Sequence, residues 1–284
     1  MGACTCIKDI GLVDCSGLGL NSVPTEFPPE IKYLSLSDND IIAVPDGVLS
    51  YLSELLELDL SGNHILELTN GSLNGLSKLQ KLNLDGNSLQ SLSNSILDPV
   101  RSSLEYLDLS RNAISSELII DVENLISLKL TSNQIQSLDT FDFSQLRKLE
   151  ALYLDKNTIQ NLKVNGANFA GLVNLKSLNL NQNFFRYVPL ASSFNAFRNT
   201  LEHLSLFNNF LLSSVSNREL PFLKTYNLSY CGIDVLDNQT FIGMPRLTTI
   251  DLTGNILDTV SPEAFDGLAS LDTLRLSVSG FLSS

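Results

Sequence analysis

The chain has 284 residues, of which 43% are hydrophobic, so it can bury a sizeable core and is not a disordered tail. Its 31 acidic residues outnumber its 18 basic ones, and the net charge of −13 argues against nucleic acid as a partner. No apolar run reaches the roughly 18 residues of a membrane helix, and the first residues lack the apolar core of a signal peptide, so we expect no membrane span in this fragment.

The N-terminal segment is rich in cysteine. Cys4, Cys6 and Cys15 lie within the first fifteen residues, whereas Cys231 stands far away in the sequence. Such crowding is typical of a disulfide-closed terminus in an oxidising compartment.

A leucine pattern then organises nearly all of the chain, in which 56 residues are leucine. Its form, Leu-x-x-Leu-x-Leu-x-x-Asn-x-Leu, is clearest at residues 79–89 and 149–159, with isoleucine as the last residue of the second copy. The Asn position, here called the Asn column, falls at residues 39, 63, 87, 112, 133, 157, 183, 209, 231, 255 and 279, with Cys at 231 and Ser at 279. Ten repeats separate the first position from the last, so the mean period is 24 residues.

The pattern is identified as the leucine-rich repeat. The resemblance implies an α/β repeat solenoid, a horseshoe with a parallel concave sheet and a mostly irregular convex side, built from eleven repeats over residues 31–284. Because the Leu-x-Leu core has period 2, each copy predicts a short strand with inward leucines and outward intervening residues. The column asparagines are predicted to bond the backbone at the bend that follows.

Cys231 occupies the Asn column, and we interpret it as a buried, free thiol. About eight repeats at a strand spacing of about 4.8 Å place it roughly 40 Å from Cys6. A disulfide needs Cα atoms within about 7 Å, so any bridge must come from the three early cysteines.

Residues 1–30 resemble the cysteine-rich N-terminal cap of extracellular leucine-rich repeat proteins such as Slit, the Nogo receptor and the small proteoglycans. Those caps carry four cysteines, paired first with third and second with fourth, and this sequence has the last three. The resemblance implies a Cys4–Cys15 bridge that leaves Cys6 without its partner, and a Cys6–Cys15 bridge is the alternative. We expect a cap cut short at its start and, because no cysteine-rich C-terminal cap follows residue 284, further chain beyond it.

Three Asn-x-Ser/Thr acceptors are predicted glycosylation sites. Asn70 and Asn238 are expected on the convex side. Asn227 is expected on a strand, facing the concave surface.

The chain lacks the motifs of an enzyme: it has no Gly-rich phosphate loop, no His-Glu-x-x-His and no Gly-x-Ser-x-Gly. His64 and His203 are interpreted as single solvent-facing histidines. We predict no catalytic residue, no cofactor and no metal.

The outward strand positions form a polar face with aromatic side chains, long enough for a protein interface of about 800 Å² per partner. Large amphipathic residues on such faces are the usual carriers of binding energy. We predict partner binding at Tyr106, Asp108, Lys129, Tyr153, Asp155, Asn179, His203 and Phe207. The alternative is that these are ordinary strand exteriors.

A second surface is predicted at one edge of the solenoid. The residue after the column Asn is usually polar or small, yet adjacent repeats place Phe184 and Phe210 there, with Tyr230 nearby. These residues predict an exposed apolar strip, the alternative binding site. A local aromatic stack that only tightens two repeats is the other interpretation.

The resemblance implies an extracellular protein-binding ectodomain, secreted or on the cell surface, of the receptor, adhesion or guidance kind. Its ligand would be a protein with a basic or mixed surface, bound on the concave face. The alternatives are a Toll-type innate-immune receptor fragment and a matrix-organising protein of the small-proteoglycan class. Homophilic or dimeric contacts are a further interpretation.

Overall fold

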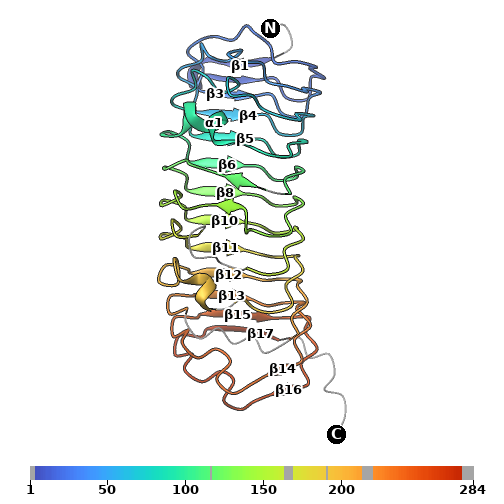
Figure 1. The fold of residues 1–284 in the computed structure, drawn as a ribbon, viewed down its shortest axis with the longest axis vertical. Coiled ribbons are helices and arrows are strands. Elements are labelled where there is room, and N and C mark those ends of the chain that lie inside the picture. Colours follow the sequence, from blue (N-terminus) through green and yellow to red (C-terminus); the bar gives the residue numbers. More distant parts are fainter. Residues whose placement is uncertain (1–3, 116, 163–168, 190, 213–219, 277–284) are drawn as a thin grey trace. The chain divides into compact units, whose positions relative to one another are not determined.

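The computed structural model describes residues 4–115, 117–162, 169–189, 191–212 and 220–276. The chain divides into two compact units. Unit 1 comprises residues 1–134 and 140–149, and unit 2 comprises residues 135–139 and 150–284. Each unit is built from stacked repeats, and each repeat contributes one short strand to the unit's row of parallel strands (Figure 1).

Unit 1 begins with an antiparallel hairpin, β1 (Thr5–Ile7) and β2 (Leu12–Asp14), joined by the short helix η1 (Lys8–Ile10). Five strands follow in parallel, each beside the one before it: β3 (Tyr33–Ser35), β4 (Glu57–Asp59), β5 (Lys81–Asn83), β6 (Tyr106–Asp108) and β8 (Ser127–Lys129). The connecting segments contain α1 (Asn94–Leu97), η2 (Asp98–Val100) and a parallel pair of β7 (Leu118–Ile119) with β9 (Phe141–Asp142).

Unit 2 continues the same plan. Its parallel strands are β10 (Ala151–Tyr153), β11 (Ser177–Asn179), β12 (His203–Ser205), β13 (Thr225–Asn227), β15 (Thr249–Leu252) and β17 (Thr273–Leu276). A second parallel pair, β14 (Val235–Leu236) with β16 (Thr259–Val260), and the short helix η3 (Ala191–Phe194) lie in the connections. None of the helices in the described ranges has the length and apolar character that crossing a bilayer requires.

The leucines build a continuous core within each unit, as predicted. In unit 1, the middle residues of adjacent strands stand in register, and Leu58, Leu82 and Leu107 are each 1% exposed. Their strand neighbours on either side are half-buried or exposed. The two-residue alternation therefore buries one side of each strand and leaves the other as an open face, here called the concave face.

The asparagine column closes the bend after each strand. The Asn63 Oδ1 accepts the N–H of Ile41 at 3.0 Å, and its Nδ2 donates to the carbonyls of Leu36 and Leu60 at 2.9 and 3.0 Å. The residue before the column is left-handed in repeat after repeat, with φ of +54° at Asp38 and +63° at Gly62. The predicted structural role of the asparagines is confirmed at the described positions, and Ser279 lies outside them.

Cys231 is buried and free, as predicted, but the backbone around it differs from the other repeats. Sulfur supplies no good acceptor, and the Leu211 N–H bonds to the Cys231 carbonyl instead, at 2.9 Å. Gly232, with φ of +72°, is a second left-handed residue in this turn, and glycine adopts that conformation without strain. Burial raises the pKa of the Cys231 thiol to about 11.

The early cysteines form one bridge. It joins Cys4 to Cys15, with Cα atoms 4.4 Å apart, and not Cys6 to Cys15. Cys6 is exposed and free.

Candidate functional site

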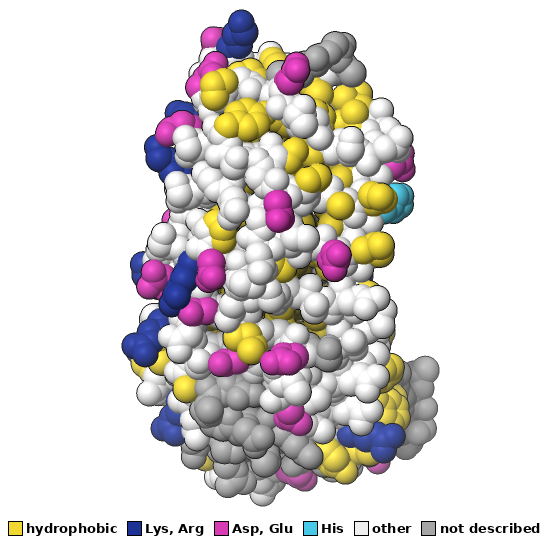
Figure 2. All heavy atoms as spheres, turned by 45° about the horizontal axis from the view of Figure 1, so that its top comes forward, with side chains coloured by type: hydrophobic (Ala, Val, Ile, Leu, Met, Phe, Trp, Pro, Cys, Tyr) yellow, Lys and Arg dark blue, Asp and Glu magenta, His cyan; other side chains and the backbone are white. Residues whose placement is uncertain are grey.

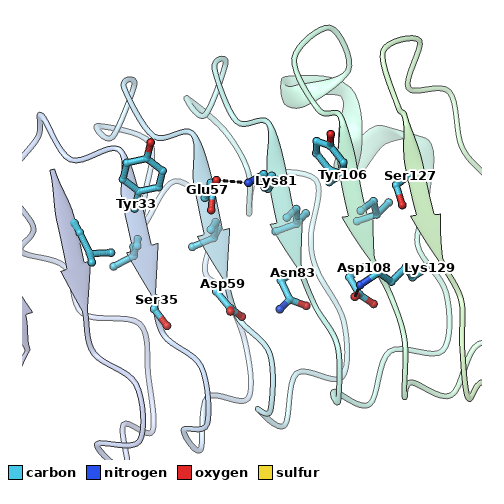
Figure 3. Close-up of a pocket in the computed structure, with 15 residues that line it drawn as sticks. Tyr33, Ser35, Glu57, Asp59, Lys81, Asn83, Tyr106, Asp108, Ser127 and Lys129 are labelled. Carbon is cyan, nitrogen blue, oxygen red and sulfur yellow. Dashed lines mark hydrogen bonds and ion pairs between the residues drawn. The ribbon is translucent and has the colours of Figure 1, made fainter. Parts of the chain in front are cut away.

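A hollow opens on the concave face of unit 1, lined by outward residues of consecutive strands (Figure 3). One row carries the first residue of each strand and the second row carries the third. The first row is Tyr33, Glu57, Lys81, Tyr106 and Ser127; the second is Ser35, Asp59, Asn83, Asp108 and Lys129.

The first row places two tyrosines on either side of an ion pair. The Lys81 Nζ lies 2.6 Å from the Glu57 carboxylate and 5.8 Å from the centroid of the Tyr106 ring. The hydrogen bond to Glu57 raises the pKa of Lys81 and so reinforces the charge that a lysine already carries at physiological pH. Both charged side chains are substantially exposed, so water weakens their attraction and leaves them able to exchange partners.

The second row has a structural task as well. Asp59, Asn83 and Asp108 each use Oδ1 to accept the backbone N–H two residues on, at 2.8, 3.1 and 3.0 Å. This side-chain turn ends the strand. The Oδ2 of Asp108 also accepts from the Lys129 Nζ at 2.9 Å, so these two predicted partner-binding residues form an ion pair.

Unit 2 has a concave hollow of its own, lined by Tyr153, Asn179 and His203 together with Asn181, Asn227, Asp251 and Arg275. The His203 Nδ1 lies 2.8 Å from the Thr225 hydroxyl, and Asn179 accepts the Asn181 N–H at 3.0 Å. Asp155 and Phe207, also predicted, are not among the described residues that line it. The Phe207 ring instead meets Tyr230 edge to face, with centroids 5.7 Å apart.

The predicted edge strip is exposed in unit 2. Phe184, Phe210 and Tyr230 are 59%, 66% and 55% exposed.

Elsewhere, basic and acidic side chains lie next to one another on the surface (Figure 2). Lysines bridge to glutamates one repeat back, as Lys224 does to Glu202 at 2.8 Å, and this hydrogen bond lowers the pKa of Glu202.

Comparison with known proteins identifies the repeat. The family model described as "Leucine rich repeat" matches residues 29–89, 102–159, 123–185 and 221–279, which together make up most of the chain. The chain belongs to the leucine-rich repeat family.

Curated relatives of this chain include podocan, Toll-like receptor 3 and Tsukushi. Mouse podocan is 29% identical over 86% of this chain and 36% of its own length. Human Toll-like receptor 3 is 29% identical over 63% of this chain and 22% of its own length, and Tsukushi of Xenopus tropicalis is 31% identical over 61% and 49%. The chain thus spans less than half the length of these relatives, and none of the three carries the name of an enzyme.

Solved leucine-rich repeat structures confirm the predicted fold. Human trophoblast glycoprotein, also called Wnt-activated inhibitory factor 1, aligns with a TM-score of 0.59 and 25% identity, covering 73% of this chain and 81% of that one. The LRIM1/APL1C complex aligns with a TM-score of 0.66 and 22% identity, covering 87% and 43%.

The eight predicted binding residues are divided between the two units. Tyr106, Asp108 and Lys129 belong to the hollow of unit 1, and the other five belong to unit 2. The prediction omitted Tyr33, Glu57 and Lys81, which line the first hollow. The signal that could have identified them is their register, because each occupies the same strand position as Tyr106.

The three sequons differ in setting. Asn70 and Asn238 are exposed residues in turns outside the strands. Asn227 is half-buried in β13, and its Oδ1 accepts both the N–H and the hydroxyl of Ser229, at 3.0 and 2.6 Å. Within the ranges that the structure describes, no His, Cys, Asp and Glu side chains are grouped as for a metal ion.

Proposed function

We propose that the chain is an extracellular protein-binding ectodomain and that it recognises a protein ligand in the concave hollow of unit 1. The observation that carries the proposal is the pair Tyr33 and Tyr106 on either side of the Glu57–Lys81 ion pair. Tyrosine is among the residues that most often anchor protein interfaces, because it presents a rigid apolar ring with a polar end. Kinship with podocan and Toll-like receptor 3 and the Cys4–Cys15 bridge support the extracellular assignment.

The charges of the hollow support a basic or mixed partner. Lys81 is matched by Glu57 and Lys129 by Asp108. Asp59 adds a further negative charge, and only one of its oxygens is used by the Ser61 N–H. A partner's lysine or arginine can therefore reach Asp59 without breaking an existing ion pair, and such complementarity mainly speeds encounter and fixes register.

The test begins with a screen of the purified chain against recombinant extracellular proteins, followed by binding kinetics on variants. Tyr33→Ala with Tyr106→Ala should raise the dissociation rate about tenfold or more, the change expected on losing an interface anchor. Leu66→Ala, which removes an exposed leucine of unit 1 outside the hollow, is the matched control and should leave the rate unchanged. Full binding by the double variant, with its melting temperature intact, would refute the site.

The concave face of unit 2 is the second candidate, because Tyr153, Asn179 and His203 line one polar hollow there. Tyr153→Ala in the same kinetic assay separates the two. Loss of binding on Tyr153→Ala together with retention by the Tyr33 and Tyr106 double variant would move the site to unit 2.

The biological class of the ectodomain follows from the full reading frame. A membrane span with an intracellular signalling domain would make it a receptor of the Toll type. Glycosaminoglycan attachment sites without a span would make it a matrix protein of the small-proteoglycan class. We further propose glycans at Asn70 and Asn238, the two exposed sequons; Asn227, which is half-buried within β13, is the weaker acceptor. Peptide mass spectrometry of secreted protein tests this.

A further inference from the structure

Six large apolar side chains of unit 2 are more than half exposed and lie in the turns that follow the strands. They are Phe184, Tyr187, Phe210, Leu212, Tyr230 and Ile256, with exposed fractions between 54% and 66%. We call this set the aromatic edge. It is separate from the concave hollow of unit 1 to which the proposed function assigns ligand binding.

Backbone and ring contacts join these residues into one surface. The Leu212 N–H donates to the Arg186 carbonyl at 2.7 Å, which ties two successive turns together. The Phe210 ring lies against the next turn, 3.7 Å from where a Cβ on Gly232 would stand, and the Tyr230 ring covers Gly254 in the turn after that. The edge therefore extends over successive repeats.

The size of the aromatic edge is that of a protein interface. A fully accessible aromatic side chain offers on the order of 150–250 Å², so six large side chains that are each more than half exposed present on the order of 600 Å². That matches the largest apolar patches of ordinary monomers, which are often functional, and approaches the roughly 800 Å² that each partner of a standard interface buries.

The charges around the edge are arranged with opposite signs at its two ends. Arg186 lies at the end nearer the N-terminus, in the turn of Phe184, and Asp258 lies at the other end, in the turn of Ile256. The Asp258 N–H donates to the Asp234 carbonyl at 2.7 Å, so a second exposed carboxylate stands one repeat away. No ion pair joins Arg186, Asp234 or Asp258 to any side chain in the described part of unit 2, whereas Lys176 and Lys224 of the same unit are paired.

We propose that the aromatic edge binds a second copy of this chain in an antiparallel, two-fold arrangement. A two-fold axis lying across the stack between Phe210 and Tyr230 reverses the order of the repeats but keeps each column of residues opposite itself. Phe184 then meets the partner's Ile256, and Arg186 meets the partner's Asp258. Symmetry makes each of these contacts twice.

This charge pattern favours a second copy over an unrelated partner. Each chain carries a net charge of −13, so two copies repel one another unless their contact is locally complementary. Arg186 and Asp258 lie at opposite ends of the aromatic edge, equally far from its centre. They can pair between two copies only when the second copy packs in the reverse orientation. An unrelated basic partner would have no use for Arg186 at one end.

Sedimentation velocity over a concentration series tests the proposal with charge reversals. Arg186→Asp alone places like charges at both symmetric contacts, and so does Asp258→Arg alone, so each should raise the dimer dissociation constant tenfold or more. An equimolar mixture of the two single variants restores both ion pairs in the heterodimer and should associate within about threefold of the wild type. Lys148→Asp, a reversal at an exposed lysine of unit 1, is the matched control and should leave dimerisation unchanged.

Phe210→Ser removes the centre of the edge and should abolish the dimer while circular dichroism and melting stay unchanged. A wild-type chain that remains monomeric to about 100 μM overturns the proposal and leaves the edge to an unlike protein. A dimer that survives Phe210→Ser, or a mixture of charge variants that does not recover, also overturns it. Because Arg186, Asp258 and Phe210 lie outside the concave hollow of unit 1, ligand binding in that hollow is measured independently on the same variants.

Discussion

The Asn column offers the sharpest test of how the repeats are held together, through a comparison of Asn63→Ala with Cys231→Ala. Asn63 serves four backbone groups at 2.9–3.1 Å, and two of them, the Ile41 N–H and the Leu36 carbonyl, belong to the preceding repeat. Each lost hydrogen bond costs about 0.5–1.5 kcal/mol net, and a buried N–H left without an acceptor adds about 1–3 kcal/mol. Asn63→Ala should therefore cost on the order of 3–5 kcal/mol.

Cys231→Ala should cost much less. The thiol donates one weak hydrogen bond, to the Leu206 carbonyl at 3.1 Å, while the Leu211 N–H already has the Cys231 carbonyl as its acceptor. About 1 kcal/mol for the lost contact and the small cavity is the expected cost. Asn63→Cys is the matched exchange. His64 stands where repeat nine has Gly232, so the backbone carbonyl at position 63 cannot replace the side chain as acceptor in the way that the Cys231 carbonyl does. The free-energy cost should therefore lie between those of the two alanine variants.

Native-state hydrogen exchange is the suitable assay, because stacked repeats need not unfold as a single cooperative unit. The Ile41 amide should lose protection in Asn63→Ala, and the Leu211 amide should keep it in Cys231→Ala. Equal costs for the two alanine variants, or unchanged protection at Ile41, would show that the side-chain amides are not what holds the bends.

Three further predictions concern the thiol, the core and one glycine. Because the pKa of Cys231 is raised to about 11, the contribution of the protonated thiol to the free energy of unfolding is complete below the unfolded-state pKa of about 8.5 and is lost as the pH rises towards 11. Mass spectrometry should accordingly find that iodoacetamide at pH 8 labels Cys6 in the native protein and Cys231 only after denaturation. Leu82→Ala should cost about 2–5 kcal/mol in chemical denaturation and Lys81→Ala under about 1 kcal/mol, and equal costs would mean that the strand register is off by one residue. Gly254→Ala, at φ of +73° with a Cβ 2.6 Å from the Tyr230 ring, should lower the melting temperature, and the loss should shrink in a Tyr230→Ala background.

Much of this architecture is readable from the order of residues because its signals are local. The spacing of two leucines predicts which side of a three-residue strand is buried. A column residue such as Asn63 forms hydrogen bonds with backbone groups of its own bend and of the bend before it. The burial of Leu82, the bonding of Asn63 and the free thiol of Cys231 could therefore be predicted without coordinates.

Other features depend on which side chains the stacking brings side by side. Lys81 and Glu57 are 24 residues apart in sequence and 2.6 Å apart in space, and Asp108 holds Lys129 across 21 residues. Whether such a residue meets an ion-pair partner or stays open to a ligand depends on rotamers and neighbours in the adjacent repeat, which the repeat pattern does not encode. Phe207 shows the same dependence, because its ring turns to Tyr230 and away from the concave hollow. The repeat spacing determines the backbone position from which each side chain projects. Packing against the neighbouring repeat determines the conformation of that side chain and the residues that it contacts.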